Sequence, residues 1–192
     1  MGNIRIKEEK IISDKFCVFK EIEFDLQKKT GEWETQKREV LSHGNAVTAI
    51  LYNREQKTVL LTRQFRIATY VNGNSSGMLT ETCAGLLENN EDPEAAAIRE
   101  IEEETGYKIT GLKKLYEAYS SAGVLSELVH YYLAYYTADQ KVSAGGGLEE
   151  EGEEVRVMEI PFAEAWRMTE KGELKDAKTI LLLLHLKLHE LL

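Results

Sequence analysis

The chain has 192 residues, of which 43% are hydrophobic and 30% charged, with a formal net charge of -9. This length suits one domain with at most a small appended unit, and the apolar content is enough for a core, which excludes a disordered chain. Because affinity for nucleic acid comes mainly from neutralising phosphates, the acidic balance argues against a nucleic-acid partner and is compatible with cation binding.

The N-terminal sequence MGNIRIKEEK contains no apolar run, so no signal peptide is predicted. The most apolar stretch, residues 180–192, is too short to span a bilayer and carries charged side chains, so it predicts an amphipathic core helix and no membrane partner. Cys17 and Cys83 lie far apart without a metal-ligand spacing, and both are interpreted as reduced thiols of a cytoplasmic protein.

The first predicted elements are strands. Residues 16–26 alternate with Phe16 at the head of one apolar face, and residues 33–41 can pair with them in a small antiparallel β unit. This unit makes residues 1–42 the first domain and residues 43–192 the second. In the second domain the pattern predicts a hairpin, a loop and a strand, over residues 46–52 with 58–64, 71–77, and 79–84.

A helix is predicted over Pro93–Thr105. Asp92 is a typical N-cap, Pro93 suits the first helical position, and Gly106 suits a left-handed C-terminal stop. Three strands and two helices are predicted after it, at residues 114–119, 127–136 and 155–160, and at residues 162–171 and 177–191. Strands and helices mixed without regular βαβ alternation predict an α+β sandwich.

Three acidic residues share one face of the helix. Glu100, Glu103 and Glu104 are spaced i, i+3 and i+4, so they span an arc of roughly 100°. Like charges one turn apart destabilise a helix by roughly 0.2–0.5 kcal/mol per pair. A divalent cation would offset this repulsion, because Mg²⁺ prefers carboxylate and phosphate oxygens and Mn²⁺ accepts the same ligands. The alternative for three glutamates alone is a solvated acidic face with Arg99 as partner.

The surrounding residues decide between these alternatives. Gly85, Glu91 and the run REIEEETGY at residues 99–107 fit the pattern G-x5-E-x7-R-E-U-x-E-E-x-G-U, with U apolar, at every fixed position. A chance match has a frequency on the order of 10⁻⁷ per starting position. The pattern is the Nudix box, and the chain resembles the Nudix hydrolases. Its one departure is Tyr107, at a position that is usually aliphatic and that concerns packing and not catalysis.

The resemblance implies an α/β/α sandwich in which the box forms a loop, a helix and a loop. It also implies that Glu100, Glu104 and the backbone carbonyl of Ala84 hold Mg²⁺, with Mn²⁺ as a substitute. Such ions neutralise a diphosphate and lower the pKa of a bound water, which then attacks phosphorus. Glu103 and Glu104 are assigned to catalysis.

Other residues of the box have supporting roles in the resemblance. Arg99 is expected to orient the carboxylates through an ion pair with Glu91. Gly85 and Leu86 are assigned to substrate binding.

Most of the chain is similar to the GDP-mannose pyrophosphatase branch of the ADP-ribose pyrophosphatase-like Nudix enzymes. The similarity is carried by KREV, RQFRIATYVNGN, ETCAGLLE, AGGGLEEE and DAKTILLL, at residues 37–40, 63–74, 81–88, 144–151 and 176–183. It implies a homodimer whose N-terminal β units exchange, so that each site takes residues from both chains. The implied reaction is hydrolysis of a nucleoside diphosphate sugar, GDP-mannose, to GMP and mannose 1-phosphate.

The branch also supplies candidate substrate contacts. They are Phe16, Lys37, Arg38, Glu39, Arg66, Glu127 and Lys178. Arg66 follows a strand end, where a guanidinium can grip phosphate through two hydrogen bonds. Residues 37–39 are expected to reach base or phosphate in the partner's site. Phe16 lies where the branch often has an aromatic residue that stacks on the base, with core packing as the equal alternative; for the others the alternative is a surface position.

An acidic run follows the triple glycine at residues 145–147. Such a loop can move and close a carboxylate over a bound metal. Glu151 aligns with the branch's loop ligand, which also serves as a candidate general base. The alternative is a simple acidic loop.

Two other functions stay open. ADP-ribose-type enzymes often carry a proline at the position of Ala122, whose absence weakens that assignment but also removes a feature of some GDP-mannose enzymes. An ADP-ribose pyrophosphatase therefore remains the alternative substrate class. A nucleotide-sensing module without catalysis is the alternative of another kind, although such modules typically lose box glutamates that this chain retains. A calcium-binding module is excluded, because no Asp/Asn-rich loop has the EF-hand spacing.

Overall fold

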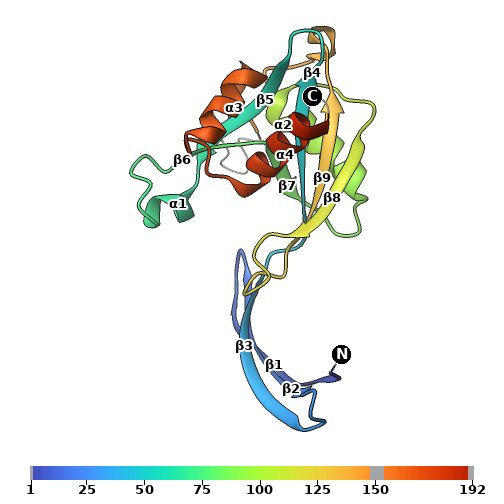
Figure 1. Ribbon diagram of the computed structural model, residues 1–192, viewed down its shortest axis with the longest axis vertical. Helices are drawn as coiled ribbons and strands as arrows, with labels where there is room; N and C mark the ends of the chain where they lie inside the picture. The colour runs from blue at the N-terminus through green and yellow to red at the C-terminus, as the bar shows by residue number, and fades with distance from the viewer. Residues whose placement is uncertain (1, 148–153, 190–192) are drawn as a thin grey trace. The chain divides into compact units, whose positions relative to one another are not determined.

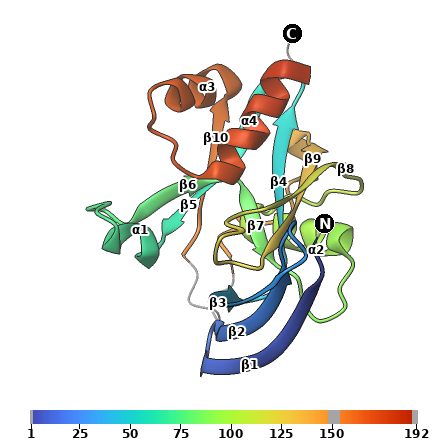
Figure 2. The same cartoon turned by 60° about the horizontal axis from the view of Figure 1, so that its bottom comes forward.

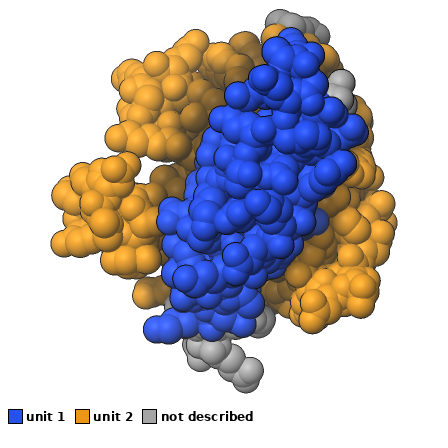
Figure 3. Space-filling view, turned by 90° about the horizontal axis from the view of Figure 1, so that it is seen from below, with its two compact units in different colours: residues 1–45, 118–129 blue, residues 46–117, 130–192 orange. Residues whose placement is uncertain are grey.

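The computed structural model describes residues 2–147 and 154–189 and divides into two compact units (Figure 3). One unit contains residues 1–45 and 118–129, and the other contains residues 46–117 and 130–192. The segment 118–129 joins the first unit through the hydrogen bond from the Leu41 amide to the Val124 carbonyl, 2.8 Å long, and through a bridge between Leu41 and Leu125.

The first unit contains an antiparallel sheet in the order β1-β2-β3, formed by β1 (Ile4–Asp14), β2 (Val18–Gln27) and β3 (Trp33–Ser42) (Figure 1). The predicted pairing of the second and third strands is confirmed, with Val18 opposite Ser42. β1 was not predicted. Almost all of its residues are exposed and two register shifts interrupt its pairing, so it lacks the apolar alternation of a half-buried strand.

The prediction that a strand begins at Phe16 is wrong. Phe16 lies in the bend between β1 and β2, and 85% of its surface is exposed. The apolar alternation begins two residues before β2. Alternation in the sequence does not show at which residue the hydrogen bonding of a strand begins. Core packing of Phe16 is therefore excluded.

The second unit contains a seven-stranded sheet. Its strands are β4 (Ala46–Asn53), β5 (Thr58–Phe65), β6 (Met78–Glu81), β7 (Cys83–Leu86), β8 (Lys113–Tyr119), β9 (Leu128–Tyr135) and β10 (Arg156–Pro161). The main order is β10-β5-β4-β9-β8, with β6 on β5 and β7 on β4. The β4–β5 hairpin is confirmed. The single strand predicted over residues 79–84 is wrong, because the chain changes partner strand at Thr82.

The helices are α1 (Ile67–Val71), α2 (Pro93–Thr105), α3 (Phe162–Glu170) and α4 (Ala177–His189), with a short 3-10 turn at Ala138–Gln140. α2 has the predicted ends: Asp92 Oδ2 accepts hydrogen bonds from the Glu94 and Ala95 amides, each 3.1 Å long, and Gly106 has a φ of 76°. α1 precedes the predicted loop and is too short for its periodicity to be recognised.

Helices cover both faces of the second sheet (Figure 2). Val47, Ala49 and Leu51 of β4 share one buried cluster with Ala97 and Ile101 of α2. The alternate residues of β4 point to the opposite face, where α4 packs, and every residue of the strand is buried. The predicted α+β class with a small N-terminal β unit is confirmed. No helix in the described ranges is long and apolar enough to cross a membrane.

Candidate active site

The acidic face of α2 is partly buried by the packing of its neighbouring face. Ile101 has no exposed surface and lies in the core with Cys83. Glu104, three positions on, is therefore drawn inward and is 2% exposed, whereas the side chains of Glu100 and Glu103 are 14% and 27% exposed. A buried carboxylate needs a compensating charge or hydrogen bonds. The exposed fraction of the three carboxylates therefore rises from Glu104 through Glu100 to Glu103.

Gly85 lets one of these carboxylates reach the backbone of β7. A Cβ atom at Gly85 would lie 2.0 Å from Cδ of Glu100, closer than two carbon atoms can approach. Glycine is therefore required here by close approach and not by an unusual φ angle. The Glu100 carboxylate therefore lies against Gly85, the residue that follows Ala84, whose backbone carbonyl is expected to act as a metal ligand.

Arg99 ties the acidic residues together. Its Nε and Nη2 atoms donate to the two carboxylate oxygens of Glu91, each 3.1 Å away, in the fork geometry of a bidentate pair. Its Nη1 donates to Glu100 at 2.8 Å and to Glu103 at 3.1 Å. Hydrogen bonding by the guanidinium lowers the pKa of Glu91, and the surrounding carboxylates raise the pKa of Arg99. Nη2 also donates to the Leu86 carbonyl at 3.4 Å.

The thiol of Cys83 lies in the negative electrostatic potential of the α2 carboxylates. It is 2% exposed, and burial raises the pKa of its thiol well above the ordinary value. The charges of Glu104 and Glu100 raise it further. The Cys83 carbonyl accepts a hydrogen bond from the Thr48 hydroxyl, 2.9 Å long, which anchors β7 on β4. The thiol therefore stays protonated beside the carboxylates.

The donor chemistry at this face fits a hard divalent cation. Glu100 and Glu104 offer carboxylate oxygens, and the tight contact of Glu100 with Gly85 brings the first of them to the backbone after Ala84. Across residues 2–147 and 154–189, no three side chains of His, Cys, Asp or Glu form a complete ligand group. A complete site would therefore need the backbone carbonyl and a further ligand, for which Glu151 is the candidate; that residue lies outside the described ranges.

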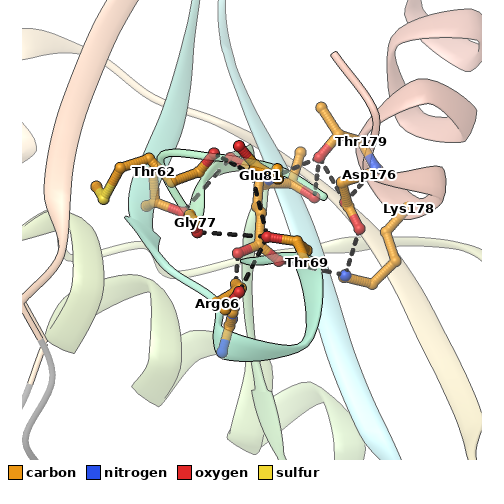
Figure 4. A network of polar contacts seen from close by, with 11 residues as sticks. Thr62, Arg66, Thr69, Gly77, Glu81, Asp176, Lys178 and Thr179 are labelled. Carbon is orange, nitrogen blue, oxygen red and sulfur yellow. Dashed lines mark hydrogen bonds and ion pairs between the residues drawn. The ribbon is translucent and has the colours of Figure 1, made fainter. Parts of the chain in front are cut away.

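A second polar cluster joins two of the predicted substrate contacts (Figure 4). Arg66 Nε donates to Glu81 Oε1 at 2.7 Å, and Lys178 Nζ lies 3.6 Å from Glu81 Oε2. Lys178 also donates to Asp176 Oδ1 at 2.7 Å. Burial alone would lower the pKa of Lys178, but the charges of Asp176 and Glu81 outweigh it and the pKa is raised. Lys178 is therefore a permanent cation.

Hydrogen bonds at the start of α4 connect this cluster with the chain segment that leads to Gly85 of the Nudix box pattern. Asp176 Oδ2 accepts from both the amide and the hydroxyl of Thr179, at 2.9 and 2.7 Å, and so caps the start of α4. The Thr179 hydroxyl oxygen accepts from the Thr82 amide at 2.7 Å. Thr82 lies between Glu81 of the second polar cluster and the strand β7 that carries Gly85. The hydrogen bond from Thr82 therefore holds the start of α4 next to both.

The remaining substrate candidates lie in the first unit. Lys37 pairs with Glu21 and Glu23, at 3.4 and 3.0 Å, and Arg38 donates to the Lys37 carbonyl at 2.7 Å. Glu39 is exposed on β3 opposite Glu21, and Phe16 is exposed in its bend. Glu127 is not an exposed strand start: its side chain is 13% exposed and accepts a hydrogen bond from Ser120, with His43 at 3.5 Å.

The sequence does not identify two residues of the second polar cluster, Glu81 and Asp176, as functional. Glu81 ends a short strand and is 3% exposed, which is unusual for a glutamate. Asp176 precedes Ala177 in a pattern typical of a helix N-cap, a signal that the sequence did contain. Nothing in the local sequence of Glu81 indicates its partners, because Arg66 and Lys178 lie far from it along the chain.

Replacing Arg99 with alanine is expected to lower the free energy of unfolding by about 1–3 kcal/mol, because three carboxylates lose their shared partner. Since Arg99 lowers the pKa of Glu91, this contribution is present above the ordinary glutamate pKa of 4.5 and is lost as pH falls through the lowered value. Urea unfolding at several pH values measures it. Arg167→Ala is the matched control, since Arg167 pairs with Glu164 and Glu173 on the surface; an equal loss for both variants would contradict the prediction.

Comparisons with known proteins cover nearly the whole chain. The NUDIX domain family matches residues 42–183, and the family of the GDP-mannose pyrophosphatase NudK N-terminal domain matches residues 3–41. A GDP-mannose pyrophosphatase of Escherichia coli O1:K1 / APEC is 47% identical over 189 residues, which cover 98% of this chain and 97% of the relative. A GDP-mannose pyrophosphatase of Citrobacter koseri is 48% identical over 183 residues, covering 95% and 94%. One of Shigella dysenteriae serotype 1 is 47% identical, with 98% and 97% covered.

Proposed function

Because the chain belongs to the Nudix family of hydrolases, we propose that it hydrolyses the diphosphate bond of GDP-mannose, giving GMP and mannose 1-phosphate. The main structural support for hydrolysis of a diphosphate is the acidic face of α2. There Arg99 donates hydrogen bonds to Glu91, Glu100 and Glu103. On the same face, Glu100 lies against Gly85. The substrate is supported by near-full-length similarity to GDP-mannose pyrophosphatases of Escherichia coli and Citrobacter koseri.

Nudix hydrolases use divalent metal ions, and the proposed ion here is Mg²⁺, with Mn²⁺ able to replace it. Its proposed ligands are Glu100, Glu104, the Ala84 carbonyl and Glu151. When bound, such a cation supplies positive charge that neutralises the diphosphate and activates water. Arg99 keeps the Glu100 and Glu103 side chains in place through its Nη1 hydrogen bonds. The preorganised carboxylates need little rearrangement when the substrate arrives.

The proposed proton acceptors for the attacking water are Glu103 and Glu151. Glu103 is the most exposed of the three helix carboxylates, so a water molecule can reach it. Arg66 and Lys178 are proposed to bind the diphosphate, since a guanidinium and an ammonium are the side chains that best match phosphate oxygens. Gly85 and Leu86 would line the substrate along β7.

The substrate proposal is tested by steady-state kinetics on GDP-mannose and ADP-ribose with the same purified protein and Mg²⁺. We expect kcat/KM for GDP-mannose to exceed that for ADP-ribose by at least about tenfold, the discrimination that a few specific hydrogen bonds to base and sugar provide. A preference for ADP-ribose would reject the substrate and keep the reaction class. Absence of turnover with either compound, and with other nucleotide sugars, would favour the sensing module.

We also propose that the protein is a cytoplasmic homodimer, in which residues 1–42 provide the contact and exchange between chains. The described cysteines carry free thiols, as expected in a reducing compartment. Large apolar side chains are exposed on the first sheet and its bend: Ile4, Ile6, Ile11, Ile12, Phe16 and Trp33. Exposed apolar side chains of this size on a small sheet favour contact with a partner, and the proposed partner is a second copy of the same unit. Phe16, Lys37, Arg38, Glu39 and Glu127 would then act in a site shared by two chains.

The dimer is tested by Ile11→Glu, which places a charge on the exposed apolar surface of β1, where Ile11 is 57% exposed. Light scattering is expected to give twice the chain mass of 21.8 kDa for the wild type and a concentration-dependent lower mass for the variant. Activity per chain should fall on dilution of the variant. The neighbouring substitution Lys10→Gln changes the net charge equally and should leave the mass unchanged; a monomeric wild type would contradict the proposal.

A further inference from the structure

The carboxylate of Glu81 lies between two cations that reach it from distant parts of the chain. Its side chain is 4% exposed, and its two oxygens face different partners: Oε1 accepts from Arg66 Nε at 2.7 Å, and Oε2 lies 3.6 Å from Lys178 Nζ. Arg66 follows β5 and Lys178 lies in the first turn of α4, so Glu81 joins two elements (Figure 4).

The backbones of both cations are already fixed by other contacts. The Arg66 amide donates to the Gly77 carbonyl at 2.8 Å, and the Arg66 carbonyl accepts from the Thr69 hydroxyl at 2.9 Å. The turn that carries Lys178 is held by Asp176 and by the bond from the Thr82 amide to Thr179. Freedom therefore remains in the long side chains, where Arg and Lys have several rotatable bonds each.

Glu81 removes that freedom at the charged ends. A carboxylate so deeply buried is stable only with close positive partners, which holds the guanidinium and the ammonium near it. The bond to Arg66 is made by Nε, so the outer edge of the planar guanidinium, between its two Nη atoms, is not the edge that meets Glu81. The Arg66 side chain is 40% exposed, which allows a ligand to approach it.

We propose that Glu81 is a positioning residue, which orients Arg66 and Lys178 so that both cations meet the same diphosphate. The inference rests on the proposed function, because it assigns these two side chains to the substrate. Glu81 itself is not proposed to contact the reacting phosphorus or the attacking water. Its effect on the reaction runs through Arg66 and Lys178, so it should disappear when they are absent.

The test is a double-mutant cycle on GDP-mannose hydrolysis with Mg²⁺, using Glu81→Gln, Arg66→Ala and the double variant. Glu81→Gln keeps the shape of the side chain and removes its charge. We expect kcat/KM to fall on the order of 10–100-fold, as for loss of an orienting partner. The fall in the double variant should be smaller than the product of the two single falls, because part of the effect of Glu81 runs through Arg66, whereas independent residues would give that product. Glu164→Gln, which removes a surface partner of Arg167, is the matched control and should leave kcat/KM unchanged.

The possible results distinguish failure of the proposed function from failure of the positioning role of Glu81. A wild type that cleaves no nucleotide sugar rejects the proposed function, whatever the variants do. A wild type that cleaves GDP-mannose, with Glu81→Gln equal to it or with multiplied losses in the double variant, overturns the role of Glu81. If Glu81→Gln does not fold, Glu81→Asp serves instead, because it keeps the charge and withdraws the carboxylate by one methylene. A tenfold or larger loss with Glu81→Asp that is smaller in the Arg66→Ala background supports the proposal, and an unchanged kcat/KM overturns it.

Discussion

Replacing Glu104 with glutamine is expected to lower kcat by on the order of 10³-fold or more, because the proposed cation loses a charged oxygen ligand that the amide does not match. The fold should persist. Glu104 is 2% exposed, and its charge is among those that raise the pKa of the Cys83 thiol. Removing a buried negative charge relieves repulsion on the helix, so the midpoint of thermal unfolding should be equal to or above that of the wild type. Stopped assays and calorimetry measure the two effects.

Glu102→Gln is the matched control for this prediction. Glu102 lies on the same helix and is a variable position of the box pattern. Its substitution removes one negative charge from α2 and should change kcat less than about threefold, in keeping with a surface electrostatic effect. Near-normal turnover of the Glu104 variant, or equal losses in both variants, would remove the basis for a metal site on α2.

Substituting Gly85 with alanine is expected to lower kcat/KM by on the order of 100-fold while stability changes little. The added Cβ would lie 2.0 Å from the Glu100 carboxylate, so the carboxylate has to move. The displaced group is the end of a flexible side chain, which can rotate toward solvent at small energetic cost. It would then leave its place beside Gly85 and lose its hydrogen bond from Arg99. A shift of about 1 Å in a catalytic constellation is enough for a loss of this size.

The control for Gly85 is Gly111→Ala, because a Cβ at Gly111 would meet no atom within 4 Å. Unfolding curves of both variants should resemble that of the wild type, and only Gly85→Ala should lose activity. Partial recovery is expected in Gly85→Ala at raised Mg²⁺ concentration, since weakened cation binding is overcome by mass action. Full activity of Gly85→Ala would mean that the observed position of Glu100 is not the one used in the reaction.

The box helix was predictable because every signal for it is local. Asp92, Pro93 and Gly106 define its ends within a few residues of one another, and the i, i+3, i+4 spacing places Glu100, Glu103 and Glu104 on one face without tertiary information. The same holds for the β4–β5 hairpin, whose strands are buried and adjacent in sequence.

The features that the sequence did not reveal depend on contacts between distant residues. β1 pairs with β2 although nearly all of its side chains are exposed, so burial leaves no pattern in it. The change of partner at Thr82 is a property of the sheet and not of the segment 79–84. Glu81 is meaningful only because folding brings Arg66 and Lys178 to it, and neither is near it in the chain.

The proposed reaction is tested by identifying its products. Purified protein is incubated with GDP-mannose and Mg²⁺, with Glu104→Gln as the blank, and the products are separated by anion-exchange chromatography and identified by mass. We expect GMP and mannose 1-phosphate in equal amounts from the wild type and almost none from the variant. Release of GDP and free mannose, or an unchanged substrate with a folded wild type, would contradict it.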